Sequence, residues 1–214
     1  MNEKPHVFSG EGVPDDTPYV IQTGNREQRK AVADWLVGLE HLGDTERERV
    51  ITAWITVLCS SRFTRIEDIP FYPKVAGYRL WDHVNDVTSN GILLGRSAKE
   101  RWGYELNQSD LVCSLILHDI DKPIIHSKLS DGTEGFTKWS KQIPHGVIGG
   151  MLLKELQFPM DVVSVVTTHA GNMPFHADHP ISWVLHYADY FSADHACLST
   201  GNKPFFQHPI QLTN

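Results

Sequence analysis

The apolar run from Leu111 to Leu117, which ends in adjacent His118 and Asp119, constrains the fold more than any other feature. Asn107 or Ser109 is suited to cap the start of this segment, so the pattern predicts a helix. Because apolar side chains cover most of the helix surface, we expect the helix to cross the core. A buried histidine and aspartate at its end would be costly unless they are paired or bind a metal.

A paired helix end would explain the His-Asp dipeptide alone, but further His and Asp residues along the chain favour a metal site. Imidazole and carboxylate are good ligands for zinc, iron or manganese. The candidate ligands each lie in or beside a segment with helical character, in the order His83, His118, Asp119, His145, His169 and Asp189. This order resembles the HD-domain superfamily, whose members bind one or two metals inside a helical bundle. The resemblance covers roughly residues 75–195.

The resemblance also implies how the ligands are divided between two metals. It assigns the first metal to four residues: His83, His118, Asp119 and Asp189. Asp119 would bridge to a second metal held by His145 and His169. Members with all six positions commonly bind two metals, so we expect two here, about 3.5–4 Å apart as in other two-metal sites. The ligand types do not distinguish iron, manganese, zinc, nickel and cobalt.

Lys122 stands three residues after Asp119, where many members of the superfamily have His-Asp-x-Gly-Lys. Asp121 replaces the Gly of that pattern, which bears on the turn geometry because Gly tolerates backbone angles that Asp accepts less readily. The Lys122 ammonium is suited to hold a phosphate or a deprotonated hydroxyl on a metal. The alternative is a charge favoured by the dipole at a helix C-terminus. We interpret Asp119 and Lys122 as catalytic residues.

Two further cationic residues lie in the segment from Ile124 to Gln142, which we expect to form a long loop. Lys138 and Lys141 flank Trp139 there, and loops of this length are often functional. A solvated surface loop is an equal alternative. We predict that Lys122, Lys138 and Lys141 bind the substrate.

Two reactions fit such a site. The first is hydrolysis of a nucleotide or other small phosphoester by a metal-activated water, with Lys122 holding the phosphoryl oxygens. The second is oxidation by a dinuclear iron site, as in the myo-inositol oxygenase group of the superfamily, which would cleave or hydroxylate a small polar substrate. The prevalence of hydrolases in the superfamily favours the first. A third possibility, a nucleotide-sensing binding module, is disfavoured by the complete ligand set.

The net charge and the cysteines indicate which binding partners and which cellular compartment to expect. The formal net charge of -7 excludes a broad basic surface for nucleic acid, so we expect a small anionic or polar substrate. Cys59 and Cys113 lie in apolar runs and read as core thiols, which favours a reducing cytoplasm. The first twelve residues lack the apolar region of a signal peptide, and no stretch approaches the ~18 apolar residues of a membrane span. We therefore expect a cytoplasmic protein without a membrane segment.

No strand, repeat or dividing linker is evident, so the sequence predicts an all-α fold: an HD-domain helical bundle with an N-terminal helical extension. We divide it into a flexible arm (1–25) and a single domain (26–214), which comprises the extension (26–74), the metal-binding core (75–195) and a tail (196–214). The predicted helices are 26–42, 45–61, 79–102, the run that ends at His118, 144–156, 162–168 and 181–195. A capping box beginning at Thr45 is expected to start the second of them.

Overall fold

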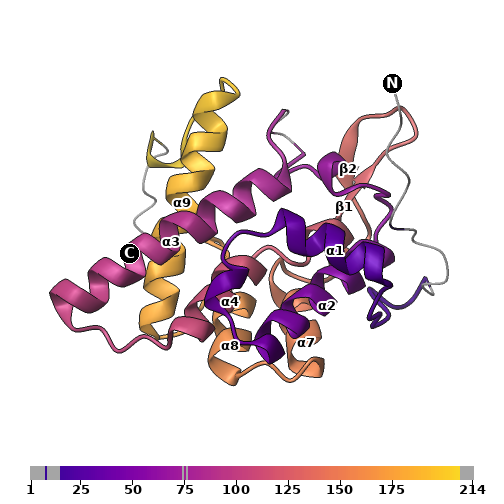
Figure 1. The fold of residues 1–214 in the computed structure, drawn as a ribbon. Coiled ribbons are helices and arrows are strands. Elements are labelled where there is room, and N and C mark those ends of the chain that lie inside the picture. Colours follow the sequence, from indigo (N-terminus) through magenta and orange to yellow (C-terminus); the bar gives the residue numbers. More distant parts are fainter. Residues whose placement is uncertain (1–7, 9–14, 74, 76, 208–214) are drawn as a thin grey trace.

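The computed structural model of the chain describes residues 8, 15–73, 75 and 77–207 (Figure 1). Its helices are α1 (Arg26–Trp35), α2 (Asp44–Ser60), α3 (Leu80–Trp102), α4 (Gln108–Leu117), α5 (Lys122–Ile125), α6 (Trp139–Gln142), α7 (Val147–Glu155), α8 (Met160–Thr168) and α9 (Pro180–Ser199). Short 3-10 helices occupy Leu39–His41, Ile66–Asp68 and Phe205–Gln207. The described strands are β1 (His126–Lys128) and β2 (Glu134–Phe136), which form one small antiparallel hairpin. The predicted all-α fold is confirmed.

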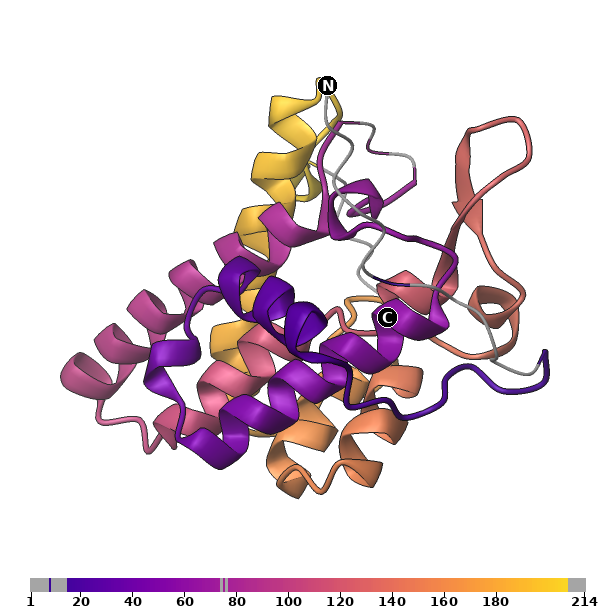
Figure 2. The same cartoon turned by 45° about the vertical axis from the view of Figure 1, so that its right-hand side comes forward.

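Helix α3 is the longest described element, and it packs against both α9 and α4 (Figures 1 and 2). Gly91 and Gly95 lie at the contact with α4, where a Cβ would overlap the side chains of Leu115 and Leu111. These glycines therefore allow α3 and α4 to approach closely. Leu93 is exposed, because the inner face of α3 turns toward its two partner helices.

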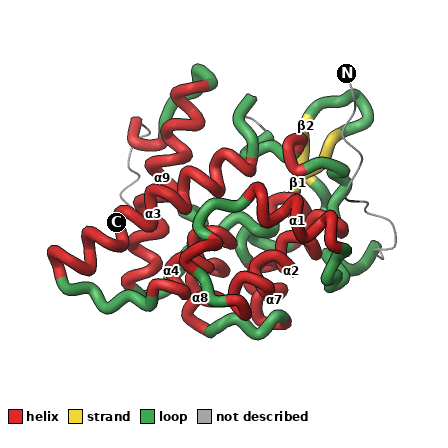
Figure 3. Tube along the Cα trace, in the orientation of Figure 1, coloured by secondary structure: helices red, strands yellow, loops and turns green. Residues whose placement is uncertain are grey.

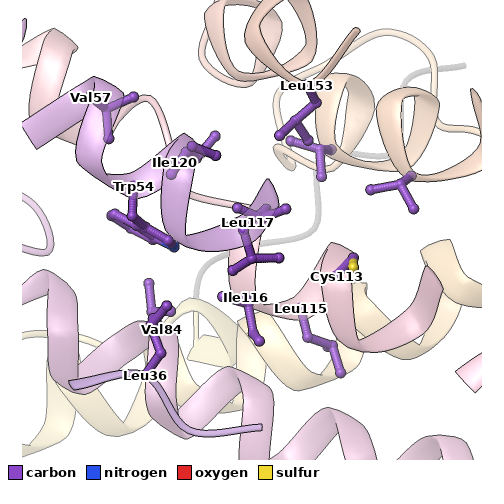
Figure 4. Close-up of a cluster of buried hydrophobic side chains, with 14 of the residues drawn as sticks. Leu36, Trp54, Val57, Val84, Cys113, Leu115, Ile116, Leu117, Ile120 and Leu153 are labelled. Carbon is purple, nitrogen blue, oxygen red and sulfur yellow. The ribbon is translucent and has the colours of Figure 1, made fainter. Parts of the chain in front are cut away.

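Helix α4 crosses the core as predicted, and each residue from Leu111 to Leu117 is buried. The core around α4 also includes Trp54 and Val57 of α2, Val84 of α3 and Leu153 of α7 (Figure 4). Trp35 and Trp54 are buried and pack edge to face with ring centroids 4.7 Å apart, so both are core residues. Cys59, Cys113 and Cys197 are buried, which confirms the prediction of core cysteines for the first two.

The N-terminal helices differ from the predicted boundaries. Asn25 caps α1 in a capping box with Gln28, but α1 ends at Trp35 rather than Leu42. The chain then turns through Gly38, whose φ of 94° is a left-handed conformation that disfavours continuation of a helix. Helix α2 begins after Gly43, so the predicted capping box at Thr45 is wrong. Residues 15–25 contain no helix or strand; the rest of the predicted flexible arm, except Phe8, lies outside the described residues.

The segment 124–142 is more ordered than the predicted loop. It contains the end of α5, the β1–β2 hairpin and α6, and Figure 3 shows the two strands in yellow. Helix α7 begins at Val147 instead of Pro144, so His145 precedes the helix. Helix α9 continues to Ser199, beyond the predicted His195, and a 3-10 turn follows within the predicted tail; residues 208–214 lie outside the described part. None of the described helices is both long and apolar enough to cross a membrane.

Candidate metal centre

Residues from five separate places in the chain meet at one buried cluster. His83 lies in the first turn of α3, and His118 and Asp119 directly follow α4. His145 precedes α7, His169 caps the C-terminus of α8, and Asp189 lies within α9. All six sequence-predicted metal ligands are therefore neighbours in the structure.

The deeper part of the cluster contains His83, His118 and Asp119, whose donor atoms all lie within 4.8 Å of one another; we call them the first donor group. The Nε2 atoms of His83 and His118 are 3.2 Å apart. Asp119 Oδ2 lies 3.4 Å from His83 Nε2 and 3.3 Å from His118 Nε2. Asp189 stands beside this group, with Oδ1 3.1 Å from His83 Nε2.

The same aspartate also belongs to a second donor group, which consists of Asp119, His145 and His169. Asp119 Oδ1 lies 2.9 Å from His145 Nε2 and 3.6 Å from His169 Nε2. The two carboxylate oxygens of Asp119 thus face different histidine pairs. This is the arrangement that a bridging carboxylate requires.

Hydrogen bonds to backbone carbonyls fix which ring nitrogen two of the histidines present to the cluster. His118 Nδ1 lies 2.9 Å from Leu115 O, and His169 Nδ1 lies 2.8 Å from Val166 O. Because a carbonyl oxygen only accepts, both Nδ1 atoms must donate, which leaves the Nε2 atom of each ring to face Asp119. Such a contact with a carbonyl or carboxylate is the usual way that a ligating histidine is oriented.

Burial and neighbouring charges shift the pKa values of the residues in the cluster. Burial opposes ionisation of Asp119, but Lys122 and then His118 hold the pKa of this carboxyl well below its ordinary value. Burial also opposes ionisation of Asp189, yet its pKa is lowered by the hydrogen bond from His83 and the charge of His118. Complete burial lowers the pKa of His83. The centre therefore favours carboxylate anions and a neutral His83, the forms in which these groups bind cations.

Lys122 is buried at the edge of the cluster. Its Nζ lies 2.6 Å from Asp119 Oδ2 and 4.1 Å from the centroid of the Phe71 ring. The ring of Phe71 also packs 4.2 Å from that of His83. Lys122 begins α5, and Pro123 lies in the first turn of that helix, where its missing N–H costs no hydrogen bond.

Two buried residues near the cluster escaped the sequence analysis as contributors to the site. Asp121 is completely buried and bonds to His145, although the sequence marked it only as a replacement for Gly. His126 is buried in β1, with Nδ1 3.3 Å from Pro70 O. Burial and the charge of Lys122 lower the pKa of His126 to about 3. The acidic side chain of Asp121 between Asp119 and Lys122 was a sequence signal that could have identified this residue. The sequence around His126 contains no comparable signal.

Lys138 and Lys141 are exposed and form no contact with either donor group among the residues that the structure describes. Lys138 Nζ bonds to the carbonyl of Asp15 and lies 4.8 Å from the Trp139 ring centroid. Together with Arg62 and Ser127, Lys138 lines a hollow of about 820 Å³ between the end of α2 and the hairpin. Substrate binding by Lys138 and Lys141 stays a prediction.

The donor set fits a metal. Two buried imidazole nitrogens face each other at 3.2 Å, and no more than one of them can donate to the other. Within the described chain, Asp119 Oδ2 is buried without a well-aligned hydrogen bond, although the Lys122 ammonium lies close to it. Cations held between these nitrogen and oxygen atoms would satisfy both features.

Comparison with known proteins gives a family and one curated relative. The family model described as "HD domain" matches residues 81–194. "Dihydroneopterin 2',3'-cyclic phosphate phosphodiesterase" from Methanocaldococcus jannaschii is 28% identical over 112 residues, which are 51% of this chain and 44% of the relative. The chain thus matches less than half of the length of that relative. No solved structure gives a significant match.

Proposed function

The chain belongs to the HD domain family, and from that premise we propose that it is a metal-dependent phosphohydrolase acting on a nucleotide or another small phosphoester. The observation that carries the proposal is the pair of donor groups that share Asp119. The curated relative is named as a cyclic phosphate phosphodiesterase, which supports a phosphodiester as the substrate.

We assign the metal ligands as the family resemblance implies. His83, His118, Asp119 and Asp189 would hold one metal, and Asp119, His145 and His169 would hold the other. When bound, such metals lower the pKa of a coordinated water and neutralise charge on a phosphoryl group. The chain itself supplies a negatively charged Asp119, which is common to the two donor groups, and a neutral His83 beside it.

Lys122 supplies the substrate contact in this proposal. Its ammonium is held at the edge of the cluster by Asp119 on one side and the face of Phe71 on the other. A cation fixed in this way is placed to stabilise charge that develops on phosphoryl oxygens. The buried surroundings strengthen that interaction, because fewer water molecules screen it. Lys138 and Lys141 would contact a more distant part of the substrate.

A substrate panel tests the proposal and separates it from oxidation. The panel contains 2',3'-cyclic nucleotides, other nucleotides and simple phosphomonoesters, each assayed with added manganese, nickel, cobalt or iron, with and without oxygen. We expect metal-dependent cleavage of a phosphoester at the same rate in both atmospheres. Oxygen uptake with a hydroxylated or cleaved organic product would instead identify the dinuclear-iron oxygenase. Binding of a nucleotide without turnover would favour the sensing module.

A further inference from the structure

His145 lies in the turn before α7 and bonds to a buried carboxylate, that of Asp121. No other described histidine of the cluster contacts this carboxylate. We propose that Asp121 is a positioning residue, which orients His145 as a ligand and strengthens metal binding at the second donor group. This inference rests on the proposed metal-dependent function and adds a residue that the six-ligand pattern does not contain.

Both oxygens of Asp121 are engaged by the same short segment. Oδ1 lies 2.8 Å from His145 Nδ1, and Oδ2 accepts a hydrogen bond of 2.7 Å from the backbone N–H of Gly146. The carboxylate is completely buried. Since a carboxylate anion only accepts, His145 must donate from Nδ1, and its Nε2 is left to face Asp119 at 2.9 Å.

The other two oriented histidines use backbone carbonyls that His145 does not have. His118 and His169 each follow a helix, and each donates to the carbonyl three residues earlier in that helix. His145 does not directly follow a helix in this way, because the extended backbone of Ile143 ends α6 two residues before it and α7 begins only at Val147. Asp121 supplies the acceptor from another part of the chain, 24 residues away in sequence.

The backbone of the turn is also specific to this arrangement. Gly146 has a φ of 91°, and a Cβ there would lie 2.8 Å from Val166 O and 2.9 Å from Thr167 O. The turn is thus pressed against the end of α8, next to His169. Asp121 accepts hydrogen bonds from both the N–H of Gly146 and the ring of His145. These two bonds fix the orientation of the ring relative to Asp119 and His169.

Asp121 adopts its position without backbone strain. Its φ of -86° and ψ of -9° are accessible to any residue, so the turn after Asp119 does not require glycine. The expected effect of the Gly-to-Asp departure on the turn is therefore absent. A glycine at this position would remove the acceptor of both His145 Nδ1 and Gly146 N, two donors in a poorly solvated site.

The consequence is a selective effect on one metal. Loss of a group that orients a ligating histidine typically weakens metal binding by about 10–100-fold. Asp121 contacts His145 and not His83 or His118, so the weakening should affect the second donor group. A carboxylate partner also makes the imidazole a stronger donor than a carbonyl partner does, which adds to the orientation effect.

Manganese binding to the metal-free protein tests the inference without an activity assay. Stepwise affinities would be measured by equilibrium dialysis with elemental analysis for wild type, Asp121→Asn and Asp121→Leu. Asn keeps one acceptor, whereas Leu keeps a similar volume and no acceptor. We expect the weaker-binding step to fall about 10–100-fold in Asp121→Leu and less in Asp121→Asn, with the stronger step unchanged. Asp161→Asn removes an exposed carboxylate 3.8 Å from His179 and serves as the matched control.

A second series keeps the test decisive if Asp121→Leu does not fold. In a His145→Ala background, Asp121→Asn should cause no further change in manganese binding, because the residue acts through the imidazole. Equal weakening of both steps, or an additional loss in the His145→Ala background, would show a general structural role and overturn the inference. Unchanged affinities in Asp121→Asn and Asp121→Leu would also overturn it, while leaving the metal centre intact. A wild type that binds no manganese, iron, nickel or cobalt would instead remove the proposed function itself.

Discussion

The two donor groups share Asp119 but are built in different ways. His83 and His118 are completely buried, with side-chain exposures of 0%, and they are carried by the two packed helices α3 and α4. His145, with a side-chain exposure of 24%, lies in a turn, and His169 ends the short helix α8. The first group is therefore a product of helix packing, whereas the second depends on a turn and its hydrogen bonds.

This difference indicates how each group responds to mutation. Apolar packing around α4 fixes the positions from which His83 and His118 project, so the first donor group should resist changes in local polar contacts. The second group is held by a few polar contacts that act together, and loss of one releases a ligand. We expect the second metal to bind more weakly and to be lost first.

Asp119→Ala should have the largest effect, because it removes the residue common to both groups. The two oxygens face His83 and His118 on one side and His145 and His169 on the other. We expect both metals and all metal-dependent turnover to be lost, as measured by elemental analysis and the phosphoester assay. Asp131→Ala, in the exposed hairpin turn, is the control; metal content equal to wild type in Asp119→Ala would remove the bridging assignment.

His83→Ala and His145→Ala separate the two groups. His145→Ala should retain one metal per chain and lose the second, whereas His83→Ala should weaken the first. His83→Ala should also lower the melting temperature of the metal-free protein more, since it leaves a cavity in a closed site while His145 is partly exposed. Identical metal loss in the two variants would show that the groups do not act separately.

Lys122→Met tests the proposal that Lys122, at the edge of the metal centre, contacts the substrate. We expect metal content to be retained and the rate to fall about 10²–10³-fold, as for loss of one charge-stabilising donor. The metal-free variant should also be less stable by about 3–5 kcal/mol, because Asp119 loses its buried partner, and bound metal should restore much of this. Lys154→Met, an exposed lysine, is the control. A full rate in Lys122→Met would exclude its proposed role.

The sequence predicted the parts of the centre that depend on periodic helices. The apolar pattern of Leu111–Leu117 predicted that α4 crosses the core, and every residue of this run is buried. The family order selected six residues that the structure brings together. These successes share a cause: a long apolar helix has few alternative ways to bury its surface.

The errors lie where contacts between distant segments decide the local structure. The β1–β2 hairpin has strands of three residues each, too short for an alternating pattern to show, and Arg79 at the start of α3 pairs with Glu134 in β2. Helix α7 begins at Val147 rather than at the predicted Pro144, because Gly146 adopts a positive φ where the turn packs against α8. Asp121 and His126 acquire their roles from burial in the folded chain, which no local pattern encodes.

His126 provides a pH test of the region next to the cluster. Its pKa of about 3 in the folded protein lies below the ordinary value near 6.5 of the unfolded chain. Between these values the unfolded chain binds a proton that the folded chain does not, so stability decreases as the pH falls below about 6.5. At pH 4.5 the loss should reach about 3 kcal/mol. Urea titrations of His126→Gln should show a weaker pH dependence than wild type, whereas exposed His41→Gln should match wild type.

The smallest effects on stability and metal affinity should come from two glycine substitutions. Each one introduces a steric overlap in the helix packing beside a different donor group. A Cβ at Gly91 would overlap Leu115 between α3 and α4, and a Cβ at Gly150 would overlap Thr167 between α7 and α8. Overpacking of this kind typically costs about 1–3 kcal/mol, offset by about 1 kcal/mol of helix propensity. Because the rigid core resists displacement, Gly91→Ala should reduce stability with little change in the second metal affinity. Gly150→Ala should move α7 away from α8 and so separate His145 from His169. Thermal melts and manganese titrations of the two variants would measure both effects, and an equal loss of the second metal in each would contradict the separate construction of the two groups.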